Sequence, residues 1–355
     1  MKKYNVAVVG VGAVGIEMLR VLRQRNFPVG ELRVFARSAR DIEVDGQKYA
    51  VKPISPVGFK GVDIALFAGT EGEKGAAVTY AQEAIRRGAV VIDNGADFRM
   101  DAKVPLVVPE VNAKDVKKHR GIIANPNCST IQMVVALWPI YQKVGIKRVI
   151  VTTLQASSGA GRGAVEQLDE EIRQIASSFP SFAGMSPSQP INKSMPVNIN
   201  VDLANRAMPQ QLAYNVFPHI GSFTDDDYTN EEWKLVKETH KIMHDDKIKI
   251  SATTVRVPVR TGHSESIYIE TEKQIEPQKV RDILSKAPGI VVKDDPKNNL
   301  YPQPLDVEGK DETFVGRIRR DSFVKNGIWL WVVADNLRKG AATNAVQIAE
   351  VLIKG

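Results

Sequence analysis

Short hydrophobic runs alternate with amphipathic segments over the first third of the chain. After the apolar run at 4–9 come several glycines, and then Ile16, Leu19 and Leu22 recur with helical spacing. Residues 74–87 form a second amphipathic segment. Further apolar runs predict strands at 31–36, 62–68, 89–93 and 121–124. Strands that alternate with helices indicate an α/β fold with a Rossmann-type, doubly wound parallel sheet.

The pattern changes after about residue 132. Strands become longer and alternate between apolar and polar residues, which is typical of an antiparallel sheet with one covered face. These strands are expected at 147–155, 248–258 and 264–272. Helices are expected at 163–177, 230–244, 277–286 and 340–353. A second α+β domain with a mostly antiparallel sheet follows from this pattern.

A stretch rich in Pro, Ser and Asn, from Ser177 to Asn200, lacks any periodicity. We expect a long loop there, and loops of this length commonly serve function or an interface.

Composition and charge narrow the class of protein. The 355 residues, 43% hydrophobic and 25% charged, suit two globular domains. The net charge of +7 is spread along the chain, which favours small anionic ligands over nucleic acid. No run of 18 apolar residues predicts a membrane span, so we expect a cytoplasmic protein.

Neither the single cysteine nor the histidines predict a metal site. One cysteine excludes an intrachain disulfide and metal sites built on cysteine pairs. His240 and His244 share a face of a probable helix, but no third ligand accompanies them. We interpret that face as solvated and expect no metal.

A glycine loop follows the first strand. Residues 10–15 fit the pattern G-x-G-x-x-G between a strand and a helix. Such glycines let the backbone turn sharply and approach a pyrophosphate at the helix N-terminus. We therefore expect Gly10, Gly12, Ala13, Val14 and Gly15 to contact a dinucleotide. The alternative is a plain strand-to-helix turn.

The end of the second strand carries Arg37, Ser38 and Arg40. Sites that prefer NAD usually place an acidic residue here to bind the ribose 2′-hydroxyl. Arginines and a serine suit a 2′-phosphate instead, so the segment favours NADP. The alternative is that both arginines are simply solvated.

Cys128 lies in the segment Asn125-Pro126-Asn127-Cys128, just before an apolar helical pattern. Pro126 ends the preceding strand, and Asn127 can cap a helix that begins near Cys128. A helix N-terminus stabilises a thiolate and can bind an oxyanion. A lone cysteine is by default a small buried hydrophobe, but this setting favours a nucleophile.

Two further segments carry candidate chemistry. The strand that ends near Arg256 leads into a turn with His263, which could serve as the acid/base partner of a cysteine. A histidine in a turn is otherwise structural or solvated. The small residues after Gln155, among them Ser158 and Gly159, permit close approach by a ligand or form a flexible turn.

Taken together, these segments resemble the bacterial aspartate-semialdehyde dehydrogenase family from about residue 4 to the end. The resemblance is carried by NPNCST at 125–130, QASSGAG at 155–161, NVFPHI at 215–220, RVPVRTGHSE at 256–265, FVGRIRRD at 314–321 and DNLRKGAATNAVQIAE at 335–350. Any one of these segments could match the family by chance, whereas all six in the same order are specific to it.

The resemblance implies a role for each matching residue. Cys128 would be the nucleophile, His263 the general acid/base, and Gln155 would orient the acyl-enzyme, with Asn127 shaping the nucleophile's surroundings. Arg256 would bind the substrate carboxylate and Glu231 its amino group. The phosphate would be held by Arg99 and Lys234. Cofactor or phosphate contacts are implied for Asn94, Ser158, Gly159 and Asn336.

The implied reaction is the NADPH-dependent reductive dephosphorylation of L-aspartyl 4-phosphate to L-aspartate 4-semialdehyde. It proceeds through a thioester, without a metal, and belongs to the biosynthesis of lysine, threonine, methionine and isoleucine. An NADP-binding domain of residues 1–132 and 330–355, a catalytic and dimerisation domain of residues 133–329, and a homodimer or homotetramer are also implied.

Related enzymes and a non-catalytic relative are the alternatives. N-acetyl-glutamyl-phosphate reductases typically have Gly-Cys-Tyr where this chain has Asn127-Cys128-Ser129. Malonyl-CoA reductases are a second enzyme alternative. A non-catalytic nucleotide-binding relative should have lost Cys128, Gln155 or His263, and all three are present.

The glycine loop departs from the family pattern. The family usually has G-x-x-G-x-x-G, one residue longer than the loop at 10–15. This chain has an apparent extra residue near 36–38. The serine and arginine that the family places on the adenosine side of the cofactor then match Ser38 and Arg40 best.

Overall fold

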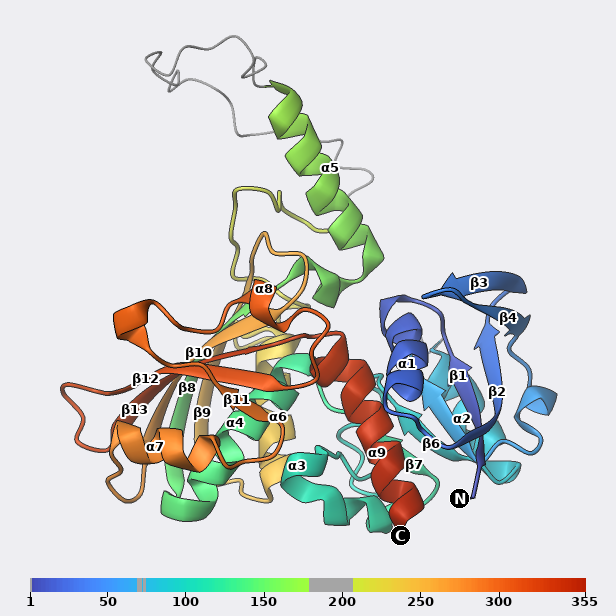
Figure 1. Cartoon of the computed structure of the whole chain (residues 1–355), viewed down its shortest axis with the longest axis horizontal. Helices are drawn as coiled ribbons and strands as arrows, with labels where there is room; N and C mark the ends of the chain where they lie inside the picture. Colours follow the sequence, from blue (N-terminus) through green and yellow to red (C-terminus); the bar gives the residue numbers. More distant parts are fainter. Residues whose placement is uncertain (1, 69–71, 73–74, 179–206) are drawn as a thin grey trace.

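The computed structural model describes residues 2–68, 72, 75–178 and 207–355. Two β-sheets dominate it. The sheet of the first third of the chain, sheet A, and the sheet of the later part, sheet B, lie on opposite sides of the C-terminal helix (Figure 1). The two-sheet α/β fold predicted from the sequence is confirmed.

Sheet A has seven strands in the order β3-β4-β2-β1-β5-β6-β7. They are β1 Tyr4–Val9, β2 Val29–Ala36, β3 Arg40–Val44, β4 Gln47–Pro53, β5 Ile64–Phe67, β6 Val90–Asp93 and β7 Ile122–Ala124. All neighbours except β3 and β4 are parallel. Side chains of β1 alternate between two apolar clusters, one on each face, as expected of a doubly wound sheet.

The β3–β4 hairpin at the edge of sheet A is absent from the sequence-based prediction. Asp45 and Gly46, with φ angles of 50° and 78°, make its turn. Asp-Gly between two strands is a strong hairpin signal because both central residues need positive φ. The polar residues of these strands conceal them from a search for apolar runs.

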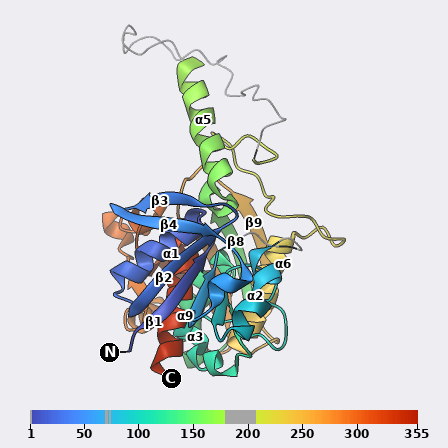
Figure 2. The same cartoon turned by 90° about the vertical axis from the view of Figure 1, so that its right-hand side faces the viewer.

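Helices cover both faces of sheet A. They include α1 Ala13–Gln24, α2 Ala76–Arg86 and α9 Thr343–Lys354. The C-terminal helix α9 packs beside α1 on one face and shares its apolar cluster (Figures 1 and 2). This packing supports the assignment of the C-terminal helix to the first domain, whereas residues 330–334 belong to β13 of sheet B. The domain boundaries stay a prediction.

Sheet B has six strands in the order β11-β12-β13-β10-β8-β9. They are β8 Ile146–Gln155, β9 Lys249–Arg256, β10 His263–Thr271, β11 Ile290–Val292, β12 Thr313–Arg320 and β13 Gly327–Ala334. The three central pairings are antiparallel, and β11 and β9 pair in parallel at the two edges. The expected mostly antiparallel sheet is confirmed, although β11, β12 and β13 were not among the predicted strands.

The remaining helices connect and cover the sheets. They are α3 Pro109–Asn112, α4 Cys128–Val144, α5 Arg162–Ser178, α6 Asn230–Met243, α7 Pro277–Leu284 and α8 Pro304–Val307. The predicted helices agree with α5, α6 and α7 to within two residues at each end. The predicted loop begins later than expected, because Ser177 and Ser178 belong to α5; its residues 179–200 lie outside the described part.

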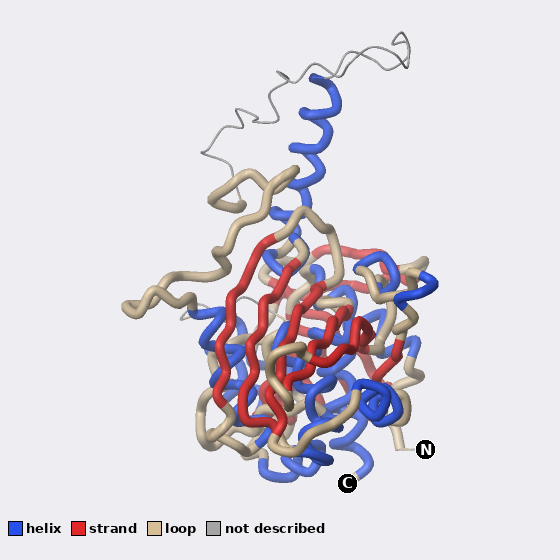
Figure 3. Tube along the Cα trace, turned by 90° about the vertical axis from the view of Figure 1, so that its left-hand side faces the viewer, coloured by secondary structure: helices blue, strands red, loops and turns tan. Residues whose placement is uncertain are grey.

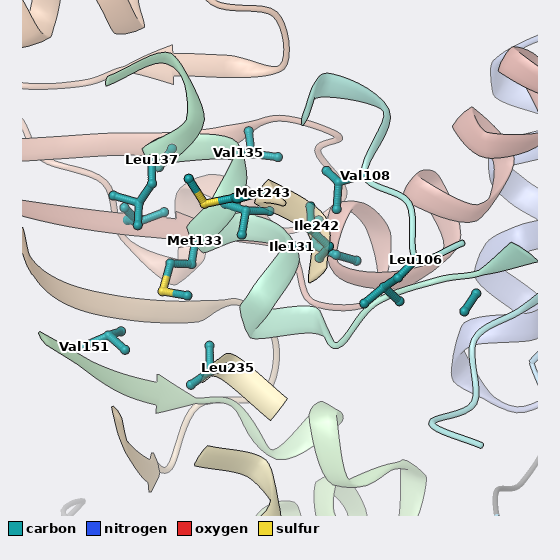
Figure 4. Packing of buried hydrophobic residues seen from close by; sticks show 14 of the residues in the cluster. Leu106, Val108, Ile131, Met133, Val135, Leu137, Val151, Leu235, Ile242 and Met243 are labelled. Carbon is teal, nitrogen blue, oxygen red and sulfur yellow. The ribbon is translucent and has the colours of Figure 1, made fainter. Parts of the chain in front are cut away.

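Helices α4 and α6 pack on the inner face of sheet B. Ile131 and Met133 of α4 share one apolar core with Leu235 and Ile242 of α6 and Val151 of β8 (Figure 4). This core holds the first residue of α4 against the ends of the sheet B strands. Among the described helices, none is both long and apolar enough to cross a membrane.

Candidate active site

Cys128 is the first residue of α4, as predicted. The Asn127 side chain accepts hydrogen bonds from the backbone N–H groups of Ser129 and Thr130, at 3.0 and 3.3 Å, and so caps the helix. A turn of π-helix, Arg338–Ala342, lies against the cysteine. A Cβ at Gly340 would lie 2.9 Å from the Cβ of Cys128 and 3.3 Å from its Cα. The backbone of this turn therefore forms one wall of the nucleophile's site.

Glu231 joins three of the predicted residues. Its Oε1 accepts hydrogen bonds from Asn127 Nδ2 at 2.8 Å and Gln155 Nε2 at 3.2 Å. Its Oε2 accepts one from Lys234 Nζ at 3.3 Å. Burial alone would raise the pKa of Glu231, but the Lys234 charge and these hydrogen bonds hold it below its usual value. A buried, charged carboxylate thus lies beside the cysteine.

Arg99 is buried on the other side of Cys128. Its guanidinium donates to the carbonyl oxygens of Asn125 and Asn94, at 2.9 and 2.7 Å, and to Glu238 Oε1 at 3.1 Å. The Glu238 Oε2 also accepts the Asn127 backbone N–H at 2.7 Å. Burial raises the pKa of Glu238, although the Arg99 charge opposes this shift. Arg99 is therefore already fixed in place by several partners.

Arg256 and His263 lie at the ends of two strands of sheet B. The Arg256 Nη1 donates to the Ala156 carbonyl oxygen at 2.5 Å, and the Ala156 backbone N–H donates to His263 Nδ1 at 3.0 Å. Both side chains are almost completely buried. A Cβ at Gly159 would lie 2.9 Å from His263 Nε2 and 3.3 Å from Arg256 Nη1, so this glycine leaves room for them.

The environment of Cys128 opposes the thiolate that the helix N-terminus would favour. Burial raises the pKa of the thiol to about 12, and the negative charge of Glu231 adds to the shift. The charges of Arg99 and Lys234 and the hydrogen bond from the Ser129 N–H oppose it but do not outweigh it. Together these contributions favour the thiol over the thiolate at the half-buried Cys128.

The glycine loop lies apart from this cluster, between β1 and α1. Gly10 has φ of 101°, and a Cβ at Gly15 would lie 1.9 Å from the Gly10 carbonyl oxygen. A Cβ at Gly12 would meet only open space, and no side chain caps α1. Open space at a free helix N-terminus fits a pyrophosphate. The shortened loop therefore retains the geometry of a dinucleotide site, with Ala13 and Val14 in the first turn of α1.

The other predicted cofactor residues fall into two groups. Arg37 and Ser38 are exposed between β2 and β3, and Arg40 is the exposed first residue of β3. Asn94 follows β6, and its Nδ2 is buried without a partner among the described residues. This orphaned donor is available to a ligand at the same edge of sheet A.

Asn336 links two loops near the histidine. Its Nδ2 donates to Ser158 Oγ at 2.9 Å, and its Oδ1 accepts the Gly262 N–H at 2.9 Å. Ser158 and Gly159 belong to a short 3₁₀ helix, Ser157–Ala160, that follows β8. Of the cofactor residues predicted from the sequence, Ser158, Gly159 and Asn336 thus lie beside His263.

The sequence analysis missed several residues of the site. Glu238 lies seven residues after Glu231 on α6, on the same helix face, a spacing that could have identified it. Gly340 carries no local signal, because its contact joins segments about 200 residues apart. Glu265, two residues after His263, is fully buried opposite Gln132 of α4. The described residues contain no cluster of three or more His, Cys, Asp or Glu able to hold a metal.

Comparison with known families defines the class. Residues 5–119 match the family "Semialdehyde dehydrogenase, NAD binding domain", and residues 137–339 match "Semialdehyde dehydrogenase, dimerisation domain". A nucleotide-binding sheet followed by a second sheet with a cysteine between them thus defines an oxidoreductase of the semialdehyde dehydrogenase class, with a nicotinamide cofactor.

Individual relatives narrow this class further. The chain is 52% identical to aspartate-semialdehyde dehydrogenase of Aquifex aeolicus, over 99% of this chain and 98% of the relative. It is 47% identical to that of Bacillus subtilis, over 99% and 97% of the two chains. The chain belongs to the aspartate-semialdehyde dehydrogenase family.

Solved structures agree with this assignment. The crystal structure of aspartate semialdehyde dehydrogenase II from Vibrio cholerae, complexed with ASA, has a TM-score of 0.88 and 42% identity, covering 100% of this chain and 99% of that one. The enzyme from Candida albicans, solved with NADP, shares the fold with a TM-score of 0.71 at 24% identity, with 99% of each chain covered.

Proposed function

We propose that this protein reduces L-aspartyl 4-phosphate to L-aspartate 4-semialdehyde and phosphate with NADPH, through a thioester on Cys128. The observation that carries the proposal is the buried cluster around Cys128. It brings together three cations, Arg99, Lys234 and Arg256, and the charged carboxylate Glu231. The V. cholerae relative, solved with ASA, supports the substrate class.

The charges of the cluster complement those of an aspartyl phosphate. Arg256 would pair with the α-carboxylate and Glu231 with the α-ammonium group, while Arg99 and Lys234 would hold the phosphate. An unacetylated amino group is required if Glu231 is to bind it, which disfavours an N-acetylated substrate. Glu238 fixes Arg99 from behind, at 3.1 Å.

The chain offers the elements that acyl transfer requires. Cys128 lies at the N-terminus of α4, where the helix dipole favours the oxyanion formed on attack. Gln155, held by Glu231 and Thr153, would orient the acyl group, and Asn127 fixes the first turn of α4. His263 would contribute its Nε2, which lies beside Gly159 and the Arg256 guanidinium. A thioester accepts hydride more readily than a carboxylate, so one hard step becomes two easier ones.

The cofactor would be held along the edge of sheet A. Gly12 leaves space for the pyrophosphate at α1, while Gly10 allows the turn and Gly15 the close packing of helix against loop. We propose NADP over NAD because Arg37, Ser38 and Arg40, without a carboxylate among them, follow β2. Asn94, Ser158, Gly159 and Asn336 would line the nicotinamide or phosphate side. When bound, the nicotinamide supplies the hydride.

The reverse reaction tests this function. The purified protein should reduce NADP⁺ with aspartate semialdehyde only when inorganic phosphate is present, and should prefer NADP⁺ to NAD⁺. N-acetylglutamate semialdehyde and malonate semialdehyde with coenzyme A serve as the competing substrates. Phosphate-independent turnover, or a preference for either competing substrate, would contradict the proposal.

A further inference from the structure

A row of hydrogen-bonded side chains leads from the π-helical turn beside Cys128 to the edge of sheet A. It starts at Lys339 and continues through three amide side chains, which we call the amide row: Asn344, Asn125 and Asn94. All except Asn94 are completely buried. The row joins three segments far apart in the sequence, so no local motif reveals it.

Lys339 fixes the direction of the hydrogen bonds at one end. Its ammonium group has three N–H donors and no acceptor. These bind Glu110 Oε2 at 2.7 Å, Gln347 Oε1 at 2.7 Å and Asn344 Oδ1 at 3.0 Å. Burial lowers the pKa of Lys339, and the neighbouring Glu110 charge opposes that shift. The Asn344 atom that faces Lys339 is therefore the amide oxygen.

Each amide of the row is oriented by the one before it. Asn344 Nδ2 donates to the Val107 carbonyl oxygen at 2.9 Å and to Asn125 Oδ1 at 2.7 Å. Asn125 Nδ2 in turn donates to Asn94 Oδ1 at 2.5 Å, with a longer contact of 3.4 Å to the Ala341 carbonyl oxygen. Backbone carbonyl groups only accept hydrogen bonds, so Val107 and Ala341 favour the same orientation as Lys339 does.

The row leaves Asn94 with an unused donor group. Its Oδ1 already accepts from Asn125, so the group that remains is the Nδ2 amide. Nδ2 is buried and has no hydrogen-bond partner among the described residues. A buried donor without a partner is costly, and a ligand oxygen would satisfy it. With the row reversed, Asn94 would present an acceptor at the same place.

We propose that Lys339, Asn344 and Asn125 are positioning residues, which hold Asn94 as a hydrogen-bond donor to an oxygen of the cofactor or of phosphate. This inference rests on the proposed function. Asn94 follows the carboxyl end of β6, where doubly wound sheets bind their ligands. Its backbone carbonyl oxygen accepts from Arg99 Nη2 at 2.7 Å, so it also adjoins the phosphate-binding arginine. Both ligands offer oxygen acceptors there.

Reversal of the amide row tests the proposal. In Asn344→Asp the new carboxylate can accept from Lys339 but cannot donate to Asn125. Asn125 then turns its Nδ2 toward the carboxylate and its Oδ1 toward Asn94, which turns in response and presents an acceptor to the ligand. We expect at least about tenfold weaker binding of one of two ligands.

Both ligands are measured without turnover. NADPH is titrated by fluorescence in the absence of phosphate, and inorganic phosphate by calorimetry on the protein loaded with NADP⁺. The ligand whose affinity falls is the one that Asn94 binds.

The Asn94→Ala background separates this role from a structural one. It removes the group through which the row acts, so that Asn344→Asp should then change the same affinity less than about twofold. Gln347→Glu is the control for charge. It adds a carboxylate beside Lys339, and among the described residues Gln347 bonds only to Lys339 and Glu110. Both affinities should stay within about twofold of the parent.

Asn125→Asp gives the same reversal one residue nearer the ligand and serves if Asn344→Asp does not fold. Its carboxylate still accepts from Asn344 and makes Asn94 turn its Nδ2 inward. Unchanged affinity for both ligands in a folded variant, or an equal loss with and without the Asn94 side chain, would overturn the proposal.

The two proposals fail in different ways. Absent turnover with aspartate semialdehyde, together with the expected affinity changes, would contradict the proposed function alone. Normal turnover of the parent, with affinities that do not respond to the reversal, would contradict the role of the amide row alone.

Discussion

Burial outweighs the nearest partners in setting the pKa of Cys128, His263 and Glu265, whereas the partners of Glu231 prevail. Burial raises the pKa of Cys128 to about 12, although this residue begins a helix and lies near two cations. His263 and Glu265, two residues apart on β10, have pKa values shifted in opposite directions by the same cause, since burial disfavours the charged form of each. The inner face of sheet B thus holds neutral groups next to charged ones.

Glu265 provides a stability prediction at this scale. Its pKa is raised well above the usual value by burial, with Gln132 opposing the shift. The stability that the neutral acid contributes is fully present below the unfolded pKa of about 4.3 and is lost as pH rises toward the folded pKa. Glu265→Gln stays neutral throughout. Its free energy of unfolding relative to the parent should therefore increase between about pH 5 and pH 8.

Urea unfolding at fixed protein concentration measures this difference. Glu312→Gln is the matched control, because Glu312 is exposed and its variant should follow the parent at both pH values. An equal effect of Glu265→Gln at the two pH values would show that Glu265 is already charged in the folded protein.

At the scale of elements, periodicity predicted the alternating strands and helices of sheet A and the helices on sheet B. It missed β3 and β4, whose residues are mostly polar, and also β11, β12 and β13. In β12 the pairing is irregular between Gly316 and Arg319, and β13 is apolar throughout and so shows no alternation. The family resemblance identified the residues around Cys128. It could not give the pKa shift of Cys128 or the contact of His263 with Ala156, because both depend on burial and on contacts between distant segments.

The π-helical turn Arg338–Ala342 makes a contact of this kind, because it packs against Cys128, which is distant in the sequence. Turns of this kind are frequent at functional sites, and buried Lys339, bound to Glu110, Asn344 and Gln347, fixes this one. Because a Cβ at Gly340 would meet the Cβ of Cys128 at 2.9 Å, Gly340→Ala must shift either Cys128 or the turn that packs against it.

We expect Gly340→Ala to lower kcat at least about tenfold, since small misplacements of reacting groups are costly. Its melting temperature should change little, because alanine favours helix over glycine by about 1 kcal/mol and offsets part of the strain. Gly340→Val should lose more activity than Gly340→Ala. Full activity in Gly340→Ala would show that the cysteine does not depend on this wall.

At the scale of the whole molecule, the described residues leave much of one face of sheet B uncovered, although Pro302 and α8 pack near Trp331. Figure 3 shows its long strands in front of the helices. Apolar side chains lie on this face, including Ile150, which is 43% exposed, and the half-buried Trp329 and Trp331. A second copy of the chain would cover this face, since these residues belong to the segment that matches a dimerisation domain.

Sedimentation analysis tests this homodimer, which could assemble further into a tetramer. Ile150→Lys should shift the protein toward monomers because it buries a charge in the interface. Val57→Lys is the control, because Val57 is 68% exposed on the sheet A side and should leave assembly unchanged. Identical sedimentation of Ile150→Lys and the parent would place the interface elsewhere.

The thioester on Cys128 is the central claim, and intact-protein mass spectrometry tests it most directly. The protein is mixed with aspartate semialdehyde and NADP⁺ without phosphate, so that the acyl-enzyme accumulates. We expect one aspartyl group per chain, located by digestion on the peptide that contains Cys128, released by phosphate and absent in Cys128→Ala. Turnover with no adduct, or an adduct on another residue, would contradict the account.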